Sequence, residues 1–259
     1  MSTVIYPSPI FGPVHSRRLG VSLGINLLPG DGKVCSFDCI YCECGFNADR
    51  RPHAKLPTRE QVSAALEAKL RQMASEGAAP DVLTFAGNGE PTMHPQFADI
   101  IADTLLLRDR YFPRARISVL SNATRLGDSR VHAALMQVDN NIVKLDTVDN
   151  AYVRRLDRPV SADYDVRQVV AQMKAFGGHC IVQTMFLRGT FEGHDVTNVG
   201  DEYVSPWLDA LQEFRSQAVM VYTIDRETPA HQLLKATREE LDDICSRVQA
   251  LGIACSASY

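Results

Sequence analysis

Four cysteines lie within ten residues of one another, in the segment Cys-Ser-Phe-Asp-Cys-Ile-Tyr-Cys-Glu-Cys at positions 35–44. The first three, Cys35, Cys39 and Cys42, have the spacing C-x3-C-x2-C. Cysteine thiolates are the usual protein ligands of iron–sulfur clusters, and three of them can hold three irons of a [4Fe–4S] cluster. The fourth iron would lack a protein thiolate and could bind another ligand directly. The spacing therefore predicts an iron–sulfur site with one open iron position.

Zinc is the other metal that these thiols could bind, with Cys44 or His53 as the fourth ligand. Structural zinc sites usually combine two pairs of closely spaced ligands, and the sequence has no second pair. This difference favours an iron–sulfur cluster over zinc. Cys44 stands two residues beyond the motif, which makes it a candidate catalytic residue that supports the cluster loop or donates a hydrogen atom.

The composition is that of an ordinary soluble globular protein, with 45% apolar and 22% charged residues in a chain of 259. A formal net charge of −4 argues against a protein that coats nucleic acid. Seven cysteines, an odd number, argue against a disulfide framework. No apolar run approaches the roughly 18 residues of a membrane helix, and the N-terminus has no secretory signal. We therefore expect a cytoplasmic protein that has no contact with membranes.

Short apolar runs alternate with helical patterns along the chain. Two capping boxes, Thr58–Gln61 and Thr237–Glu240, predict helix starts, and a third amphipathic stripe begins at Val166. Such alternation predicts a parallel sheet with right-handed crossovers. The runs that we expect to form strands are Leu23–Leu28, Val82–Ala86, Ile117–Leu120, Ile142–Leu145, Cys180–Leu187, Val219–Ile224 and a last short run at Ile253–Ala257.

Six strand–helix units predict the fold class α/β, in the form of a partial (β/α)6 barrel of the TIM type. A complete eight-unit barrel typically takes about 250 residues, and here the long connection before the first helix uses much of the chain. We expect one domain over residues 1–259. It would include a proline- and glycine-rich N-terminal arm at 1–18 and a cluster-bearing loop at 29–57.

The C-x3-C-x2-C motif, with the aromatic Tyr41 before its last cysteine, resembles the signature of the radical SAM superfamily. The resemblance implies that Cys35, Cys39 and Cys42 bind a [4Fe–4S] cluster and that Tyr41 lies at the cofactor. The open iron would be chelated by the amino and carboxylate groups of S-adenosylmethionine. An external electron donor of the ferredoxin or flavodoxin type would then drive cleavage of the cofactor to a 5′-deoxyadenosyl radical. The family's partial barrel of about six units agrees with the units counted above.

Further positions resemble the family's cofactor-binding elements. The segment Gly87, Asn88, Gly89, Glu90 and Pro91 is similar to a Gly-Gly-Glu-Pro element that holds the methionine amino group. Glycines let the backbone approach a ligand, and a carboxylate suits an ammonium. By the same resemblance, Asn122 and Asp146, each at the end of a strand run, would contact the ribose or the methionine carboxylate.

A narrower resemblance, to the branch of wyosine-base synthases, runs along nearly the whole chain. The characterised enzymes of that branch act on transfer RNA and use a second cluster, bound by cysteines ahead of the motif. This chain has no cysteine before Cys35. The resemblance therefore implies the radical SAM core, with a small molecule or a tRNA base as the substrate. The segments that carry it are Phe11–Gly20, Ser22–Ile25, Cys35–Cys42, Gln183–Gly189 and Tyr222–Glu227.

Two arginines are candidates for a substrate clamp. Arg188 and Arg226 follow the fifth and sixth strand runs, and reacting groups of β/α barrels come from the carboxyl ends of strands. We expect both to line an opening near the cluster and to bind an anionic group through their planar guanidinium groups. Arg17 and Arg18, together with His15, form a further basic patch before the first strand.

Two other functions stay open at this point. The first is an activase that generates a radical on a partner protein. The second is a non-catalytic iron–sulfur or zinc-binding module, which would need neither the barrel nor the segment 87–91. Formation of 5′-deoxyadenosine with a metabolite extract, tRNA or a protein partner would distinguish these functions. The sequence does not predict the oligomeric state.

Overall fold

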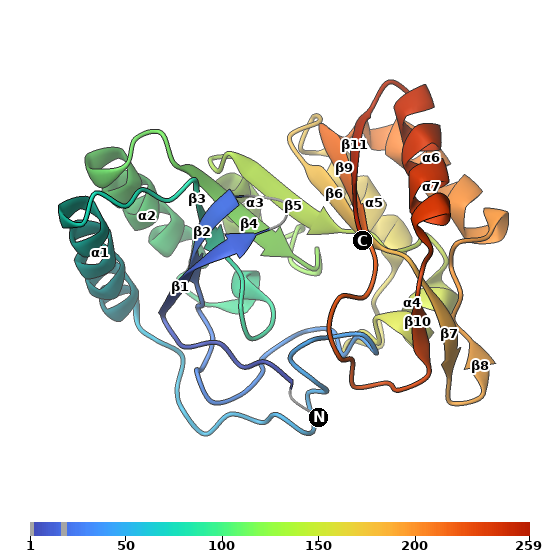
Figure 1. The fold of residues 1–259 in the computed structure, drawn as a ribbon, viewed down its shortest axis with the longest axis horizontal. Coiled ribbons are helices and arrows are strands. Elements are labelled where there is room, and N and C mark those ends of the chain that lie inside the picture. The colour runs from blue at the N-terminus through green and yellow to red at the C-terminus, as the bar shows by residue number, and fades with distance from the viewer. Residues whose placement is uncertain (1–2, 17–19) are drawn as a thin grey trace.

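The computed structural model describes residues 3–16 and 20–259. A curved sheet of eight strands forms its centre (Figure 1). β1 pairs with β2 antiparallel, and every other pair of neighbours in this sheet is parallel. The strands lie in the order β1 (Ile10–Ser16), β2 (Gly20–Ile25), β3 (Val82–Phe85), β4 (Arg116–Ser121), β5 (Asn140–Lys144), β6 (Ile181–Met185), β9 (Ala218–Tyr222) and β11 (Ala254–Ser258).

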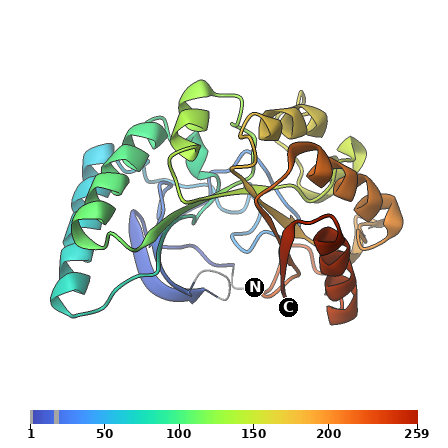
Figure 2. The same ribbon diagram turned by 90° about the horizontal axis from the view of Figure 1, so that it is seen from above.

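The helices lie along the outer side of the sheet, which bends into an open arc (Figure 2). A small antiparallel sheet stands beside it, in the order β10 (Leu233–Lys235), β7 (Leu187–Phe191) and β8 (His194–Asp195). None of the helices in the described part of the chain is long and apolar enough to cross a membrane. The helices are α1 (Arg59–Ser75), α2 (Phe97–Tyr111), α3 (Ser129–Leu135), α4 (Asn150–Leu156), α5 (Val166–Lys174), α6 (Asp201–Phe214) and α7 (Arg238–Ala250), with a short 3₁₀ helix η1 (Pro91–Met93).

The helix starts predicted from the sequence are confirmed. Thr58 and Thr237 each close a complete capping box, at α1 and α7, which satisfies backbone N–H groups that a helix leaves without internal partners. The stripe Val166, Val169, Val170 and Met173 of α5 is buried, as are the core-facing residues of α1. These faces pack on the outer side of the sheet and bury apolar surface there.

The predicted partial barrel is also confirmed. The six strand runs overlap β2, β3, β4, β5, β6 and β9, and the last short run overlaps β11, although the bounds differ, most at β2. β1 and β11 are the two ends of the sheet order and do not pair with each other. The barrel is therefore open along one side, and the carboxyl ends of its parallel strands share one edge.

The N-terminal arm differs from the prediction, because residues 10–16 form β1 at the edge of the sheet. Pro13 is tolerated there, since an edge strand leaves one row of backbone groups without a ladder partner. The ring of Phe11 occupies the space next to Gly24 of β2, where a Cβ atom would clash with it. Arg17 and Arg18, the predicted basic patch with His15, lie outside the described residues.

Candidate active site

A cavity of about 480 Å³ lies at the carboxyl ends of the parallel strands, beside the cluster-bearing loop. This volume is within the range typical of sites for small molecules and cofactors. Its wall combines apolar side chains, such as Phe37, Ile142 and Met185, with a few polar groups. The strand residues that line it include Thr84 of β3, Leu120 and Ser121 of β4, Lys144 of β5, Gln183 of β6, and Met220 and Tyr222 of β9.

The loop that carries the cysteines is held between two parts of the barrel. On one side, the Val34 N–H donates to the Asn88 carbonyl at 2.9 Å, and the Glu90 N–H donates to the Val34 carbonyl at 3.1 Å. On the other side, the Asp38 N–H donates to the Asp157 carbonyl at 2.9 Å. Because backbone hydrogen bonds hold both sides, the position of the motif depends on the segment after β3 and on the end of α4, both far away in the sequence.

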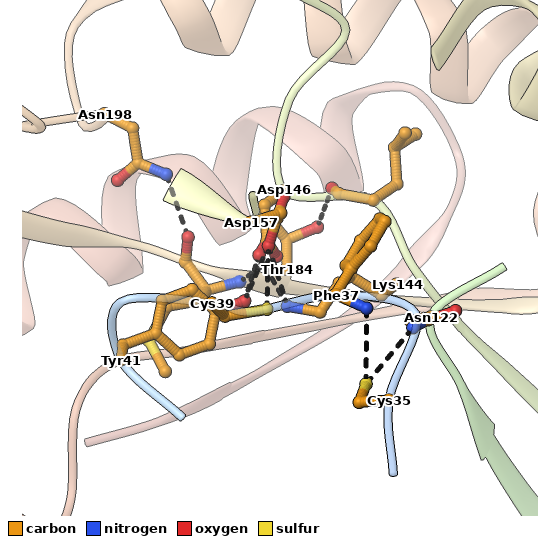
Figure 3. Close-up of polar contacts among 12 residues, drawn as sticks. Cys35, Phe37, Cys39, Tyr41, Asn122, Lys144, Asp146, Asp157, Thr184 and Asn198 are labelled. Carbon is orange, nitrogen blue, oxygen red and sulfur yellow. Dashed lines mark hydrogen bonds and ion pairs between the residues drawn. The ribbon is translucent and has the colours of Figure 1, made fainter. Parts of the chain in front are cut away.

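Cys35, Cys39 and Cys42 all line the cavity, and none forms a disulfide. The Cys35 sulfur accepts from the backbone N–H of Phe37 and from the Asn122 side chain, both at 3.5 Å (Figure 3). The Cys39 sulfur lies 3.4 Å from Oδ1 of Asp157. The loop therefore presents three thiols to one space, as the motif predicts.

The three thiols ionise differently, because their surroundings differ. Burial raises the pKa of Cys35 to about 12 and that of Cys39 well above its usual range. Cys42 has its pKa lowered to about 6, because the Cys44 thiol donates a hydrogen bond to it, with Lys33 nearby as a further cause. The same hydrogen bond raises the pKa of Cys44, so Cys42 carries negative charge before the other thiols.

The donor set suits a four-iron cluster, because three thiols line one cavity and each thiolate of such a cluster binds a different iron. Among residues 3–16 and 20–259, no group of three His, Cys, Asp or Glu side chains is close enough to hold a single metal ion. His53, the alternative zinc ligand, is exposed, and its backbone N–H donates to Asp31 at 2.9 Å.

A buried network connects the cluster-bearing loop to β5 (Figure 3). The Lys144 ammonium lies 2.8 Å from Asp146 and 3.3 Å from Asp157, and 4.4 Å from the centre of the Tyr41 ring. The Tyr41 hydroxyl donates to Asp146. Burial raises the pKa of Asp157 to about 7, and the positive charge of Lys144 opposes this shift.

Asp146 does not have the position that the resemblance implies. Its side chain has no exposed surface and is absent from the cavity wall. Its oxygens accept from Tyr41, Lys144 and the backbone N–H of Met185, the last at 2.8 Å. The structure therefore places Asp146 behind the wall, where it holds Tyr41 and Lys144, both of which do line the cavity.

The segment 87–90 lies at the cavity, but its residues serve different purposes. Gly87 and Gly89 line the wall with φ values of 137° and 134°, a region that glycine adopts without steric cost. A Cβ at Gly89 would clash with the Val34 carbonyl of the cluster-bearing loop. Asn88 is fully buried and donates to the carbonyls of Tyr6 and Pro29, both at 2.8 Å. It braces the chain and, contrary to the prediction, does not line the cavity.

Glu90 is the central brace of this segment, with 1% of its surface exposed. Its Oε1 accepts from the backbone N–H and hydroxyl of Thr92, at 3.0 and 2.6 Å, and from the Ser121 hydroxyl at 3.0 Å. Its Oε2 accepts from the Asn122 N–H at 2.5 Å. Oε1 thus already accepts three hydrogen bonds, so the ammonium of a bound cofactor would have to contact Oε2.

Glu90→Ala should therefore lower the free energy of unfolding as well as weaken cofactor binding. The buried N–H groups of Thr92 and Asn122 would lose their acceptor, and each such loss costs about 1–3 kcal/mol. Urea denaturation of the variant measures this loss. Glu239→Ala, in the exposed first turn of α7, is the control and should cost less than about 1 kcal/mol. Equal stability of the two variants would show that Glu90 is not a brace.

The other predicted site residues are divided between the cavity and the outer surface. Asn122, Cys44 and Arg226 line the cavity. The Asn122 side chain faces Cys35 and Ser36, while Cys44 lies 3.5 Å from the Gly87 carbonyl oxygen. Arg188 is half-exposed on β7, where its Nε donates to Glu240 of α7 at 3.0 Å. The prediction that Arg188 lines the opening is wrong, because that strand leaves the barrel for the small sheet.

Three charged residues near the motif were assigned no role in the site from the sequence. They are Lys33, Lys144 and Asp157, which lie close to the cysteine motif in space. Lys33 precedes the first cysteine by two residues, and this proximity is a signal that sequence analysis could have used. Lys144 is the charged residue within the predicted strand run Ile142–Leu145, a weaker signal. Asp157 gives no local signal, because only the fold brings it to Cys39.

The fold and the site together define an α/β partial barrel with three thiols gathered at the carboxyl ends of its strands. The family model of the radical SAM superfamily matches residues 31–198, which is more than half of the chain, and the chain belongs to this superfamily. The radical SAM domain implies a [4Fe–4S] cluster and S-adenosylmethionine as cofactors.

Relatives of the chain carry the description UPF0026 protein. One from Helicobacter pylori is 27% identical over 84% of this chain and 66% of its own length. One from Synechocystis is 33% identical over 69% of this chain and 64% of its own length. The chain thus spans slightly less than two thirds of the length of these relatives.

Solved structures show the same fold at low sequence identity. A radical SAM methyltransferase from Sphaerobacter thermophilus is 15% identical, with a TM-score of 0.67 over 92% of this chain and 66% of that one. Streptococcus suis SuiB, solved with S-adenosylmethionine bound, is 14% identical, with a TM-score of 0.64 over 91% of this chain and 50% of that one. TYW1 with a lysine–pyruvate adduct is 13% identical, with a TM-score of 0.62 over 88% and 73% of the two chains.

Proposed function

We propose that this chain is an enzyme that cleaves S-adenosylmethionine reductively and directs the resulting radical to a small molecule or a tRNA base. One observation carries the proposal: the cavity lined by Cys35, Cys39 and Cys42 is also lined by Gly87, Gly89 and Glu90 and by residues of the parallel strands. A cavity at this edge of a β/α barrel is where such enzymes hold their reacting groups.

The two cofactors supply the chemistry when they are bound: one electron from the cluster breaks a carbon–sulfur bond of S-adenosylmethionine. The chain's own residues hold and shield the site. Gly87, Gly89 and Oε2 of Glu90 would contact the methionine end, and Tyr41 and Lys144 form the wall near Cys39. Lys144 has three N–H donors, and two point to Asp146 and Asp157. The third would serve an anionic group in the cavity.

Of the two arginines predicted to clamp the substrate, Arg226 lines the cavity and Arg188 does not. The Arg226 Nη1 donates to the Tyr6 hydroxyl at 2.9 Å and to Glu43 at 2.7 Å, which fixes the guanidinium at the cavity. The remaining N–H groups of the guanidinium can bind an anionic group of the substrate. A radical acts on one C–H bond only if the substrate is held close to it, so a clamp separate from the cofactor is needed.

The proposal is tested by measuring 5′-deoxyadenosine after anaerobic incubation with S-adenosylmethionine and dithionite. Separate reactions contain no addition, bulk tRNA, a small-molecule extract or a protein fraction. We expect 5′-deoxyadenosine in all of them, with the largest amount where the substrate is present. Its stimulation by the protein fraction alone would support an activase instead. Its absence from every reaction, or a reduced-cluster electron-spin spectrum that ignores S-adenosylmethionine, would contradict the proposal.

Arg226→Gln should strongly weaken the stimulation by tRNA or by the extract and leave the basal 5′-deoxyadenosine. A lost charged hydrogen bond of about 1.5–3 kcal/mol corresponds to a roughly 10- to 150-fold weaker response to the stimulating fraction. Arg188→Gln is the matched control, since Arg188 lies outside the cavity wall, and it should respond like the unmodified protein. If both variants keep the full stimulation, Arg226 has no part in substrate binding.

The electron donor is the remaining partner. We propose a protein of the ferredoxin or flavodoxin type, because the cluster needs one electron for each cleavage. The same assay with such a donor in place of dithionite identifies the type that works.

A further inference from the structure

Lys33 is a buried cation next to the cysteine motif. Its side chain is 1% exposed, and its Nζ donates to the Gly45 carbonyl at 2.7 Å. A buried ammonium is strongly destabilising unless opposite charge lies close to it. Negative charge close to Lys33 must therefore compensate its ammonium.

Asp38 compensates Lys33 only in part. Its Oδ1 lies 3.5 Å from Nζ, and it also accepts from the Asn47 N–H at 2.7 Å. Its other oxygen lies 3.8 Å from the Arg158 guanidinium, and 18% of the side chain is exposed. Asp38 is thus shared between two cations and partly screened by solvent, which weakens its interaction with each of them.

The cluster-bearing loop folds around Lys33, which precedes Cys35 by two residues. The Lys33 Nζ contacts Asp38, which lies between Cys35 and Cys39, and the Gly45 carbonyl beyond Cys42. The thiolates of a bound cluster would therefore lie beside an ammonium that has only a shared carboxylate as its counter-charge. Lys144, the other ammonium near the motif, differs in this respect. It has two carboxylates of its own, Asp146 and Asp157, at 2.8 and 3.3 Å.

We propose that Lys33 is a positioning residue for the reduction step, and that its buried positive charge raises the midpoint potential of the cluster held by Cys35, Cys39 and Cys42. This inference rests on the proposed function. Reduction of the cluster by an external donor adds one negative charge to the site. A fixed cation in a medium of low dielectric constant stabilises that charge, and local charge and hydrogen bonds to the sulfurs set the potentials of iron–sulfur clusters.

The proposal is tested by redox titration of the reconstituted protein, followed by the electron-spin signal of the reduced cluster. Lys33→Gln removes the charge and keeps a hydrogen-bond donor for the Gly45 carbonyl. We expect the reduced-to-oxidised ratio at a fixed potential to fall about tenfold, which is 59 mV for a one-electron couple. Lys33→Arg keeps the charge and should restore most of the ratio. Lys55→Gln, an exposed lysine in the same loop, is the control and should change nothing.

A merely structural role of Lys33 gives a different result. In that case Lys33→Gln would bind less iron, but the clusters that remain would keep the midpoint potential of the unmodified protein. That result would overturn the proposal. If Lys33→Gln holds no cluster, Asp38→Asn decides the question. Loss of the carboxylate leaves the Lys33–Asp38 pair with a net positive charge, so the potential should rise, and an unchanged or lower potential would show that the charge of this pair does not set the potential and would overturn the proposal. These titrations need no turnover, so they fail independently of the 5′-deoxyadenosine assay.

Discussion

Cys39→Ala should remove most of the iron that the protein binds after anaerobic reconstitution, from about four irons per chain in the unmodified protein. Cys39 lies on the cavity wall together with Cys35 and Cys42, and two thiolates cannot hold a cluster that already lacks its fourth ligand. Iron and sulfide analysis of the desalted protein measures the effect. We expect the visible absorption of the cluster to fall in the same proportion.

Cys245→Ala is the matched control for this experiment. Cys245 is also a buried cysteine, but it lies on the apolar face of α7, which packs against the sheet. A buried free cysteine behaves as a small hydrophobe, so its replacement should leave the iron content unchanged. A content near eight irons per chain would indicate a second cluster. Stoichiometric zinc in an anaerobically prepared sample would show that the motif holds zinc.

Lys144→Met should destabilise the protein by about 3–5 kcal/mol, because it leaves buried carboxylates without their cation. The side chains of Asp146 and Asp157 are 0% and 3% exposed, so water cannot replace the ammonium. The Tyr41 ring would lose its cation as well. Urea denaturation, followed by circular dichroism, gives the change in the free energy of unfolding.

Two further variants separate this electrostatic effect from the loss of a side chain. Lys235→Met changes an exposed lysine of β10 and should alter stability by no more than about 0.5 kcal/mol. Asp157→Asn in the Lys144→Met background removes one of the unpaired charges and should restore part of the loss. If the double variant is as unstable as Lys144→Met, the unpaired charge of Asp157 is not the cause.

The features that could be predicted from the sequence are those encoded over short distances along the chain. Capping boxes at Thr58 and Thr237 and apolar stripes fix helices through contacts three or four residues apart. The cysteine spacing places three thiols on one loop, wherever that loop lies. Strand runs that alternate with helices predict a parallel sheet, because helices between the strands cover it and bury its apolar residues.

The features that could not be predicted depend on which strand ends meet. The sequence shows a glutamate after a strand, but only the pairing of β3 with β4 brings its carboxylate to Ser121 and Asn122. In the sequence Asn88 resembles a cofactor-binding residue, but in the structure its side chain donates to the Tyr6 carbonyl of the N-terminal segment. Arg188 and Arg226 both follow strand runs, and the small sheet takes Arg188 away from the cavity.

The sequence by itself determined two features of this chain: the cysteine spacing predicts three thiols that can bind a cluster, and the periodicity predicts the barrel. Both signals are local properties of the chain. Only the tertiary structure decided which polar groups face the cavity and which brace it. Asp146 and Lys144 stand two residues apart at the end of β5, yet Lys144 lines the wall and Asp146 is sealed behind it. The direction of such side chains depends on neighbouring strands and on the loop packed against them, and those contacts span about a hundred residues, as between Tyr41 and Asp146.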